Sequence, residues 1–231
     1  ICERLSVMKR QESTHYKIQD YLAPEWQAGL VASAAAGGSW DANNDDESSV
    51  SSSSLPSFKM DESWRSKMCE WCYRVVDHYG LARESVAVAM NILDRYVSKS
   101  VVSDTNYTLA TVAAIQIAIK VVSPVKLSMG SVTYEQFSVD DIISMEVQML
   151  SALSWHVHPP TAMDFCGMLI DFSFTDSTID IRNEIQEKAR YLTELSVFEY
   201  YFTTRNPSSI AVGKSTKMIV SYYISLIQHA L

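Results

Sequence analysis

The chain has 231 residues, of which 47% are hydrophobic and 20% are charged, with a net charge of −8 at neutral pH. This composition is ordinary for a globular protein with a sizeable core, and the acidic balance without a stripe of Lys and Arg disfavours binding to a nucleic-acid backbone. No uninterrupted apolar run reaches the roughly 18 residues of a membrane span, and no signal peptide is visible at the start.

The first two segments differ sharply in pattern. Residues 1–26 contain a short amphipathic stretch that ends in "YKIQDYLA", and we expect an N-terminal approach helix there. Residues 27–59 are rich in Ala and Gly, then in acidic residues and Ser, and they lack periodic apolar residues. Such a segment cannot offset the entropy of ordering, so we predict a disordered insert, either a plain linker or a phospho-regulated tract.

Helical periodicity begins near Met60 and continues through three segments. The first, over residues 64–79, repeats apolar side chains at steps of three and four, and Gly80 follows as the expected stop. The second is "ESVAVAMNILDRYV". The third, "YTLATVAAIQIAIK", is apolar nearly all round, which is typical of a helix that other helices enclose.

The remaining segments are helical as well. "SVDDIISMEVQMLSAL" opens with Ser138 and Asp141 in the spacing of a capping box, and Pro159 and Pro160 then break the chain before further helical patterns. No alternating strand pattern competes with them. We therefore predict an all-α fold in which other helices surround one central helix.

Cys69 and Cys72 form a C-x-x-C motif that could indicate redox or zinc chemistry. A redox motif belongs at a helix N-terminus, whereas Cys69 lies about two turns inside a helix whose cap is Asp61 or Ser63. A structural zinc site needs four ligands, and His78 has no partner in the sequence. We interpret both cysteines as core residues, and the four scattered cysteines of the chain favour a reducing compartment over a disulfide framework.

Four charged residues fall on apolar helical stripes. Asp94 needs a partner there, which Arg65 could supply as a buried structural ion pair. Glu146 lies in the middle of another apolar face, and Lys120 ends the most hydrophobic helix. Lys120 and Glu146 could pair with each other inside the fold, Lys120 could simply reach solvent, or both could face a partner protein.

These motifs together resemble the cyclin family. "WRSKMCEWCYRVVDHYGL" is similar to the family's M-R-x-x-L-x-D-W helix, and "NILDRYVSKS" contains its L-D-R-[FY]-[LV]-S core. "ATVAAIQIAIK" is similar to the central T-A-A-x-x-x-A-S-K helix. The family's pattern ends in a motif that contains M-E and P-T, and "MEVQMLSALSWHVHPPTAMDF" is similar to this motif. The resemblance covers about Trp64 to Phe165.

The resemblance implies an arrangement of domains and site residues. It places a five-helix N-terminal cyclin box over residues 60–160 and the start of an incomplete second repeat over 161–231. Lys120 and Glu146 fall on the positions that face the kinase in cyclins, and Arg65 and Asp94 fall on an internal salt bridge. Where many cyclins have two acidic residues just after the lysine, this chain has "VVS", which leaves the choice of kinase open.

The resemblance also implies a substrate-docking patch on the first long helix and the start of the central one. The corresponding residues are Trp64, Lys67, Met68, Trp71, Tyr107 and Thr108. Lys67 replaces an apolar residue and Thr108 replaces a glutamine, so recruitment of substrates through this patch is left open. Trp71 could equally belong to the core or line the groove.

By resemblance, the chain is expected to be a regulatory subunit of a cyclin-dependent Ser/Thr kinase in cell division, not itself an enzyme. Its expected partners are the kinase and the kinase's substrates or inhibitors, with no nucleic acid, membrane, metal or cofactor. We expect it in the nucleus or cytoplasm. The alternative is a cyclin-fold adaptor in transcription that does not activate a kinase.

Overall fold

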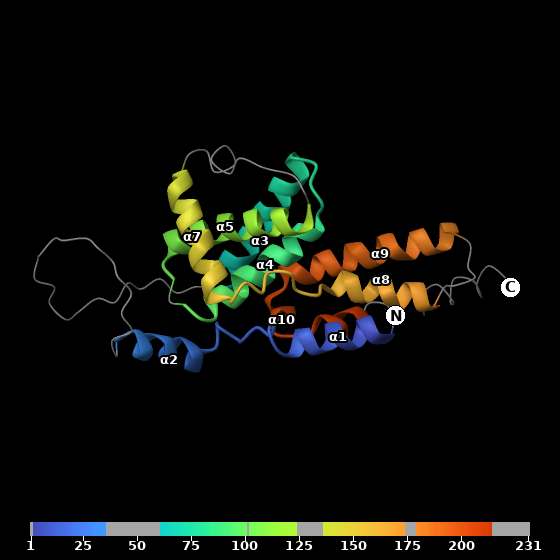
Figure 1. The fold of residues 1–231 in the computed structure, drawn as a ribbon, viewed down its shortest axis with the longest axis horizontal. Helices are drawn as coiled ribbons and strands as arrows, with labels where there is room; N and C mark the ends of the chain where they lie inside the picture. The colour runs from blue at the N-terminus through green and yellow to red at the C-terminus, as the bar shows by residue number, and fades with distance from the viewer. Residues whose placement is uncertain (1, 36–60, 101, 124–135, 174–178, 214–231) are drawn as a thin grey trace, which may run out of the picture.

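The computed structural model describes residues 2–35, 61–100, 102–123, 136–173 and 179–213, and these residues form α-helices and connecting turns without a β-strand. The helices of the first unit are α3 (Glu62–His78), α4 (Glu84–Val97), α5 (Asp104–Val122) and α7 (Val139–Ala152). The second unit contains α8 (Ala162–Ser173), α9 (Ile179–Phe198) and the short α10 (Tyr200–Thr203). Two helices, α1 (Cys2–Ser13) and α2 (Pro24–Ala35), precede both units (Figure 1).

Helix α5 is the central helix of the first unit. It packs most extensively against α4 and α7, and the main hydrophobic cluster of the molecule surrounds it. Small side chains on α5, among them Ala110, Ala113 and Ala118, are buried and allow the neighbouring helices to approach closely. Helix α5 is long and apolar enough to cross a membrane by length and composition, but here its apolar residues lie in the core. The predicted enclosed central helix is confirmed.

Side-chain caps fix where the helices begin and end. Asp61 accepts a hydrogen bond from the Trp64 backbone N–H at 2.9 Å and caps α3. The predicted capping box at the start of α7 is confirmed, because Ser138 and Asp141 each accept a hydrogen bond from the other's backbone N–H. Gly80, just beyond α3, has a φ of +62°, which only glycine adopts without strain.

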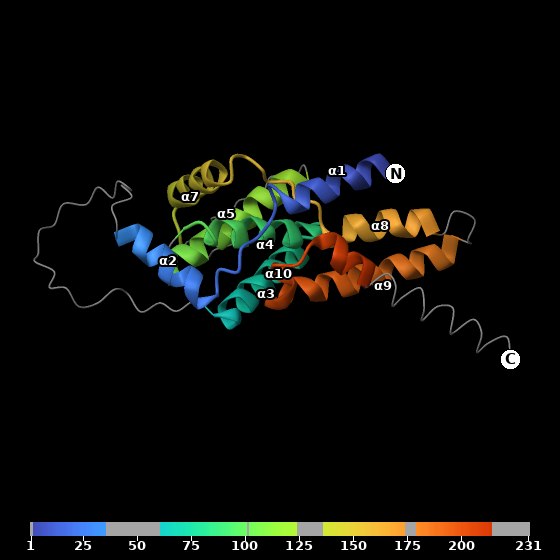
Figure 2. The same cartoon turned by 90° about the horizontal axis from the view of Figure 1, so that it is seen from below.

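The second unit is smaller and depends on its neighbours. Helices α8 and α9 pack on each other, and α9 also contacts α3 and α4 of the first unit. Helix α1 lies beside α8, where Met8 enters the second hydrophobic cluster (Figure 2). The buried Glu12 of α1 accepts hydrogen bonds from the Ser208 backbone N–H and hydroxyl, at the start of the helical residues 207–213.

The structure corrects the predicted boundaries at the N-terminal side. The approach helix expected over 1–26 is α1, which ends at Ser13, and α2 then covers residues 27–35 of the segment predicted to be disordered. Alanine is the best helix former and proline is favoured at the first helical position, so "PEWQAGLVASAA" forms a helix without strong amphipathicity. The acidic and Ser-rich part lies outside the described residues, as does 124–135, so a fifth helix in the box stays a prediction.

Candidate functional site

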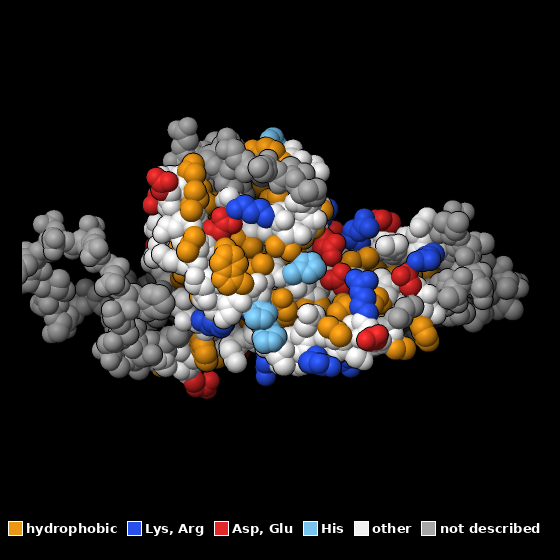
Figure 3. Space-filling model, viewed as in Figure 1, with side chains coloured by type: hydrophobic (Ala, Val, Ile, Leu, Met, Phe, Trp, Pro, Cys, Tyr) orange, Lys and Arg blue, Asp and Glu red, His pale blue; other side chains and the backbone are white. Residues whose placement is uncertain are grey.

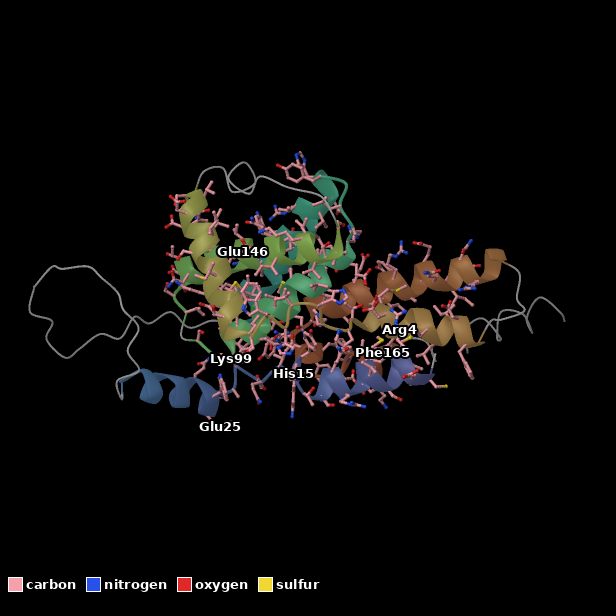
Figure 4. All side chains as sticks on the ribbon, viewed as in Figure 1. Arg4, His15, Glu25, Lys99, Glu146 and Phe165 are labelled. Atoms are coloured by element: carbon pink, nitrogen blue, oxygen red, sulfur yellow. The ribbon has the colours of Figure 1, made fainter. Side chains whose placement is uncertain are left out.

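Lys120 and Glu146 form an ion pair at the edge where α5 passes α7. Lys120 Nζ lies 2.6 Å from Glu146 Oε1. The Lys120 side chain is 53% exposed, whereas the Glu146 side chain is only 11% exposed. We call Lys120 and Glu146 the edge pair; Glu146 is labelled in Figure 4. The pair combines two of the alternatives left open by the sequence, since the residues contact each other and the Lys120 side chain is still half-exposed to solvent.

Exposed apolar side chains continue from the edge pair along α7. Val139, Ile143 and Val147 are exposed at successive steps of four, and Trp155 beyond the helix end is 71% exposed. We call these four residues the α7 ridge. Hydrophobic side chains are visible along this helix in the space-filling view (Figure 3). An apolar surface with one ion pair at its margin is typical of a protein-interaction site.

An unusual turn holds Trp155 away from the core. Ser154 and Trp155 both have positive φ, at 50° and 63°. The Trp155 backbone N–H donates to Leu150 O at 2.9 Å, which closes the end of α7. Left-handed backbone costs about 1–2 kcal/mol in a residue with a side chain, so the surrounding contacts hold this turn against strain. The sequence prediction did not include Trp155 among the site residues, although a bulky aromatic directly after a helix end is a usable signal.

Arg65 and Asp94 form a second ion pair, which is buried. Arg65 Nε and Nη2 donate to the two Asp94 carboxylate oxygens at 3.0 and 2.9 Å, and both side chains are at most 3% exposed. Arg65 Nη1 also donates to Val197 O at 2.7 Å and Phe198 O at 3.2 Å, at the end of α9. We call Arg65 and Asp94 the junction pair. It joins α3 and α4 of the first unit to α9 of the second.

The stretch between α1 and α2 adds a third side chain to the junction pair. The Tyr21 hydroxyl donates to Asp94 Oδ1 at 2.7 Å. Burial raises the pKa of the Tyr21 phenol well above its usual value, and the Asp94 carboxylate raises it further. Neighbouring Asp20 accepts a hydrogen bond from the Tyr200 hydroxyl at 2.7 Å. Both units and the N-terminal stretch thus meet at one hydrogen-bonded cluster.

One residue of the predicted substrate-docking patch, Tyr107, lies in the core. Tyr107 is fully buried, because the first turn of α5 directs its ring into the main cluster, so it cannot line a groove. Met68 and Trp71 are half-buried against that cluster, and the half-buried Thr108 donates to Asp104 O at 3.1 Å. Lys67 lies over the Trp64 ring, with its Nζ 5.7 Å from the ring centroid. The candidate patch is therefore reduced to the half-buried edges of α3 and α5.

Cys69 and Cys72 are core residues, as interpreted from the sequence. Both are fully buried on α3. Burial raises the pKa of the Cys69 thiol to about 12 and that of the Cys72 thiol well above its usual value. A redox-active cysteine needs the opposite shift. Within the described ranges, no three His, Cys, Asp or Glu side chains gather in a way that could hold a metal ion.

A cavity of about 720 Å³ lies between the two units and was not expected from the sequence. The stretch after α1 contributes Tyr16 and Ile18 to its wall, α4 contributes Met90, and α8 and α9 supply the opposite side. A cavity between units arises from the packing of distant segments, so no local sequence pattern indicates it.

Comparison with known proteins agrees with this fold. Residues 42–158, which are half of the chain, match the family "Cyclin, N-terminal domain", so the chain belongs to this cyclin family. It is 26% identical over 157 residues to Cyclin-A1-1 of Arabidopsis thaliana, covering 67% of this chain and 34% of the relative. It is 27% identical over 159 residues to the G2/mitotic-specific cyclin-B of Dictyostelium discoideum, covering 68% and 35%.

The fold comparison points the same way. The structure of a viral cyclin from herpesvirus saimiri superimposes with a TM-score of 0.61 at 18% identity, covering 69% of this chain and 70% of that chain. This likeness shows the cyclin fold. The chain spans about a third of the length of the curated relatives named above. It is a cyclin-box protein.

Proposed function

We propose that the chain is a regulatory subunit that binds and activates a cyclin-dependent Ser/Thr protein kinase in the control of the cell cycle. The observation that carries the proposal is the edge pair, whose ammonium group is exposed beside the apolar α7 ridge. The A-type and B-type cyclins among the relatives support the assignment to the cell cycle. Location in the nucleus or cytoplasm belongs to the same proposal.

The mechanism follows from the composition of this surface. Val139, Ile143, Val147 and Trp155 offer apolar area whose burial supplies most of the binding free energy, at roughly 25 cal/mol per Å² before the costs of association. The partner's mobile helix is held in its active position when it packs on this surface, which shifts the kinase population toward the active state. The kinase supplies the chemistry, and the cyclin-box chain supplies only binding energy and position.

The edge pair adds polar specificity to this surface. Glu146 is already nearly covered, so docking removes little more water from its carboxylate. Lys120 keeps that carboxylate paired while its remaining N–H groups can donate to backbone carbonyls of the partner. An unpaired carboxylate at an apolar interface would be costly, so the intramolecular pair prepares the surface for a partner.

The test removes the edge pair without a net change in charge. We expect Lys120→Ala/Glu146→Ala to weaken binding of a purified cyclin-dependent kinase by at least about tenfold, with a matching loss of kinase activation, because two polar contacts are lost. The matched control is Glu184→Ala/Lys188→Ala, which removes a Lys–Glu pair on α9 whose side chains are 62% and 63% exposed. Binding is measured by calorimetry and activity by phosphorylation of a peptide substrate.

Two results would count against the proposal. The first is unchanged kinase binding in the edge-pair variant with an intact helical circular dichroism spectrum. The second is equal loss in the edge-pair variant and the α9 control. The phosphorylation assay distinguishes the alternative, a cyclin-fold adaptor in transcription, because an adaptor would not stimulate phosphorylation by any of the kinases tested.

A further inference from the structure

Two histidines from distant parts of the chain stack on each other at the surface. The rings of His15 and His156 are parallel within 9°, with centroids 4.2 Å apart. Tyr16 meets the same His156 ring edge-on at 6.1 Å. His15 is exposed just after α1 (Figure 4), and His156 is half-buried in the connection from α7 to α8. This contact presses the stretch between α1 and α2 onto the first unit.

A buried cation contacts the Tyr16 ring and the backbone of His156. Arg95 of α4 is only 2% exposed. Its Nη2 donates to His156 O at 2.6 Å, its Nη1 donates to Asn91 Oδ1 at 3.2 Å, and its guanidinium carbon lies 4.8 Å from the Tyr16 ring centroid. These partners are all neutral, and desolvation lowers the pKa of Arg95 to about 10. In the part of the chain that the structure describes, no carboxylate forms a salt bridge with Arg95 or with either imidazole.

The other charged groups on the packed elements are cationic or already engaged. Lys99, just after α4, donates to Ala152 O at the end of α7. The Glu12 carboxylate accepts hydrogen bonds from Ser208, and the Asp20 carboxylate accepts one from Tyr200. The Asp94 carboxylate is bound by Arg65 and Tyr21. The titratable or charged residues that flank the stack in sequence on the three elements are His15, Tyr16 and Lys17 before α2, Arg95 and Lys99 on or after α4, and His156 and His158 after α7.

We propose that the stacked pair His15–His156 is a pH-sensitive latch, which holds residues 14–19 against the first unit when both rings are neutral and releases them when both are protonated. Histidine ordinarily changes charge between pH 5 and 8. Two imidazolium rings face to face repel one another, and no carboxylate of the described residues forms a salt bridge with either ring to balance their charge. The latch lies apart from the edge pair, and its operation does not depend on the proposed kinase.

Release would be local and would open the cavity between the units. On one side, Glu12 and Met8 anchor α1 to the second unit, and on the other, Tyr21 is bound to Asp94. Between these anchors, the stretch is held by the histidine stack, by the contact of Tyr16 with Arg95 and by Ile18, which packs on the main hydrophobic cluster. Tyr16, Lys17 and Ile18 of that stretch line the cavity, so its wall on this side would loosen as the pH falls.

Trypsin cleavage after Lys17 measures the release in the full chain. A free peptide with the sequence of residues 11–23, digested in the same tube, corrects for the effect of pH on trypsin. We expect the corrected cleavage rate to rise about tenfold between pH 7.5 and pH 5.5, as repulsion between two charges about 4 Å apart would produce. His15→Phe/His156→Phe keeps the stacked rings but not the charge, and its corrected rate should not change with pH.

A neighbouring histidine provides the matched control. His158→Phe removes an imidazole outside the stack and should keep the full pH-dependent rise. If the double variant fails to fold, the single variant His15→Phe, at an exposed position, replaces it in the test. The corrected cleavage rate of this variant should rise less on acidification than that of the unmodified chain. A flat rate in the unmodified chain, or an equal rise in the unmodified chain and the Phe variants of the stack, would overturn the latch.

Discussion

The junction pair and the edge pair have similar chemistry but lie in different surroundings. Arg65 and Asp94 are at most 3% exposed and bind two further segments of the chain, the stretch before α2 and the end of α9. Lys120 is 53% exposed, and its partner among the described residues is Glu146. A buried pair costs free energy to desolvate and is retained only when its hydrogen bonds are complete. An exposed pair contributes little to folding and stays available to a partner. Burial therefore separates a structural pair from a candidate binding pair.

Removing one member of the junction pair should have the largest effect. Asp94→Ala leaves the Arg65 guanidinium buried with only backbone carbonyls as acceptors, and it also removes the acceptor of the Tyr21 hydroxyl. We expect the free energy of unfolding to fall by about 3–5 kcal/mol, measured by urea denaturation. Asp77→Ala breaks a salt bridge to Arg83 in which the carboxylate is half-exposed, and it should cost less than about 1 kcal/mol. Similar losses in the two variants would remove the distinction between buried and exposed pairs.

Alkaline pH should weaken the folded state through a buried thiol near the junction pair. Cys69 lies one helical turn from Arg65, and burial raises the pKa of its thiol from the usual 9 to about 12. Below pH 9 the thiol is protonated in both the folded and the unfolded state, so its contribution is fully present. As the pH rises above 9, the unfolded chain releases the proton while the folded chain keeps it, and stability falls by about 1.4 kcal/mol per pH unit.

The measurement compares unfolding free energies at about pH 8.5 and about pH 10.5 by urea denaturation. Cys69→Ala removes this titration, so its decline over that range should be smaller by about 2 kcal/mol than that of the unmodified chain. Cys2→Ala changes an exposed cysteine and should retain the full decline. If Cys69→Ala and Cys2→Ala decline equally, the thiol of Cys69 does not titrate as its burial requires.

Removing the third side chain of the junction should have a smaller effect. Tyr21→Phe keeps the ring in the core and deletes one hydrogen bond to Asp94, whose Oδ1 still accepts from Arg65 Nε. We expect a loss of about 1–2 kcal/mol, since the acceptor is charged but remains partnered. Tyr191→Phe, at an exposed position on α9, should be neutral in the same denaturation assay. A neutral Tyr21→Phe would mean that the N-terminal stretch contributes no stability to the junction.

The sequence predicted the elements of the first unit well because their signals are local. Apolar periodicity located α3, α4, α5 and α7. Ser138 located the start of α7, and for α3 the sequence offered Asp61 or Ser63, of which the structure selects Asp61. The pairing of Arg65 with Asp94 followed from two opposite charges on apolar stripes, and the resemblance to cyclins placed them together. These inferences depend only on side chains a few residues apart or on a known pattern.

The rest of the site depends on contacts between distant segments. Tyr21 reaches Asp94 across 73 positions, and Arg65 binds a backbone carbonyl at Val197, which carries no side-chain signal. Tyr107 was assigned to a docking patch by resemblance. A motif match gives the place of a residue in the pattern, but it does not show whether the side chain points into the core or to the surface. The exposure of Trp155 depends on a left-handed turn that its residue type does not favour.

Removing the edge pair should have the smallest effect on stability. Its effect on kinase binding should be much larger. Lys120→Ala/Glu146→Ala removes both charges together, so no carboxylate is left unpaired, and the exposed ammonium group contributes little to the pair in water. We expect the free energy of unfolding to change by less than about 1 kcal/mol, while kinase binding falls by at least about tenfold. A loss as large as that of Asp94→Ala would mean that Lys120 and Glu146 hold α5 and α7 together, and the weakened binding would then follow from an altered fold.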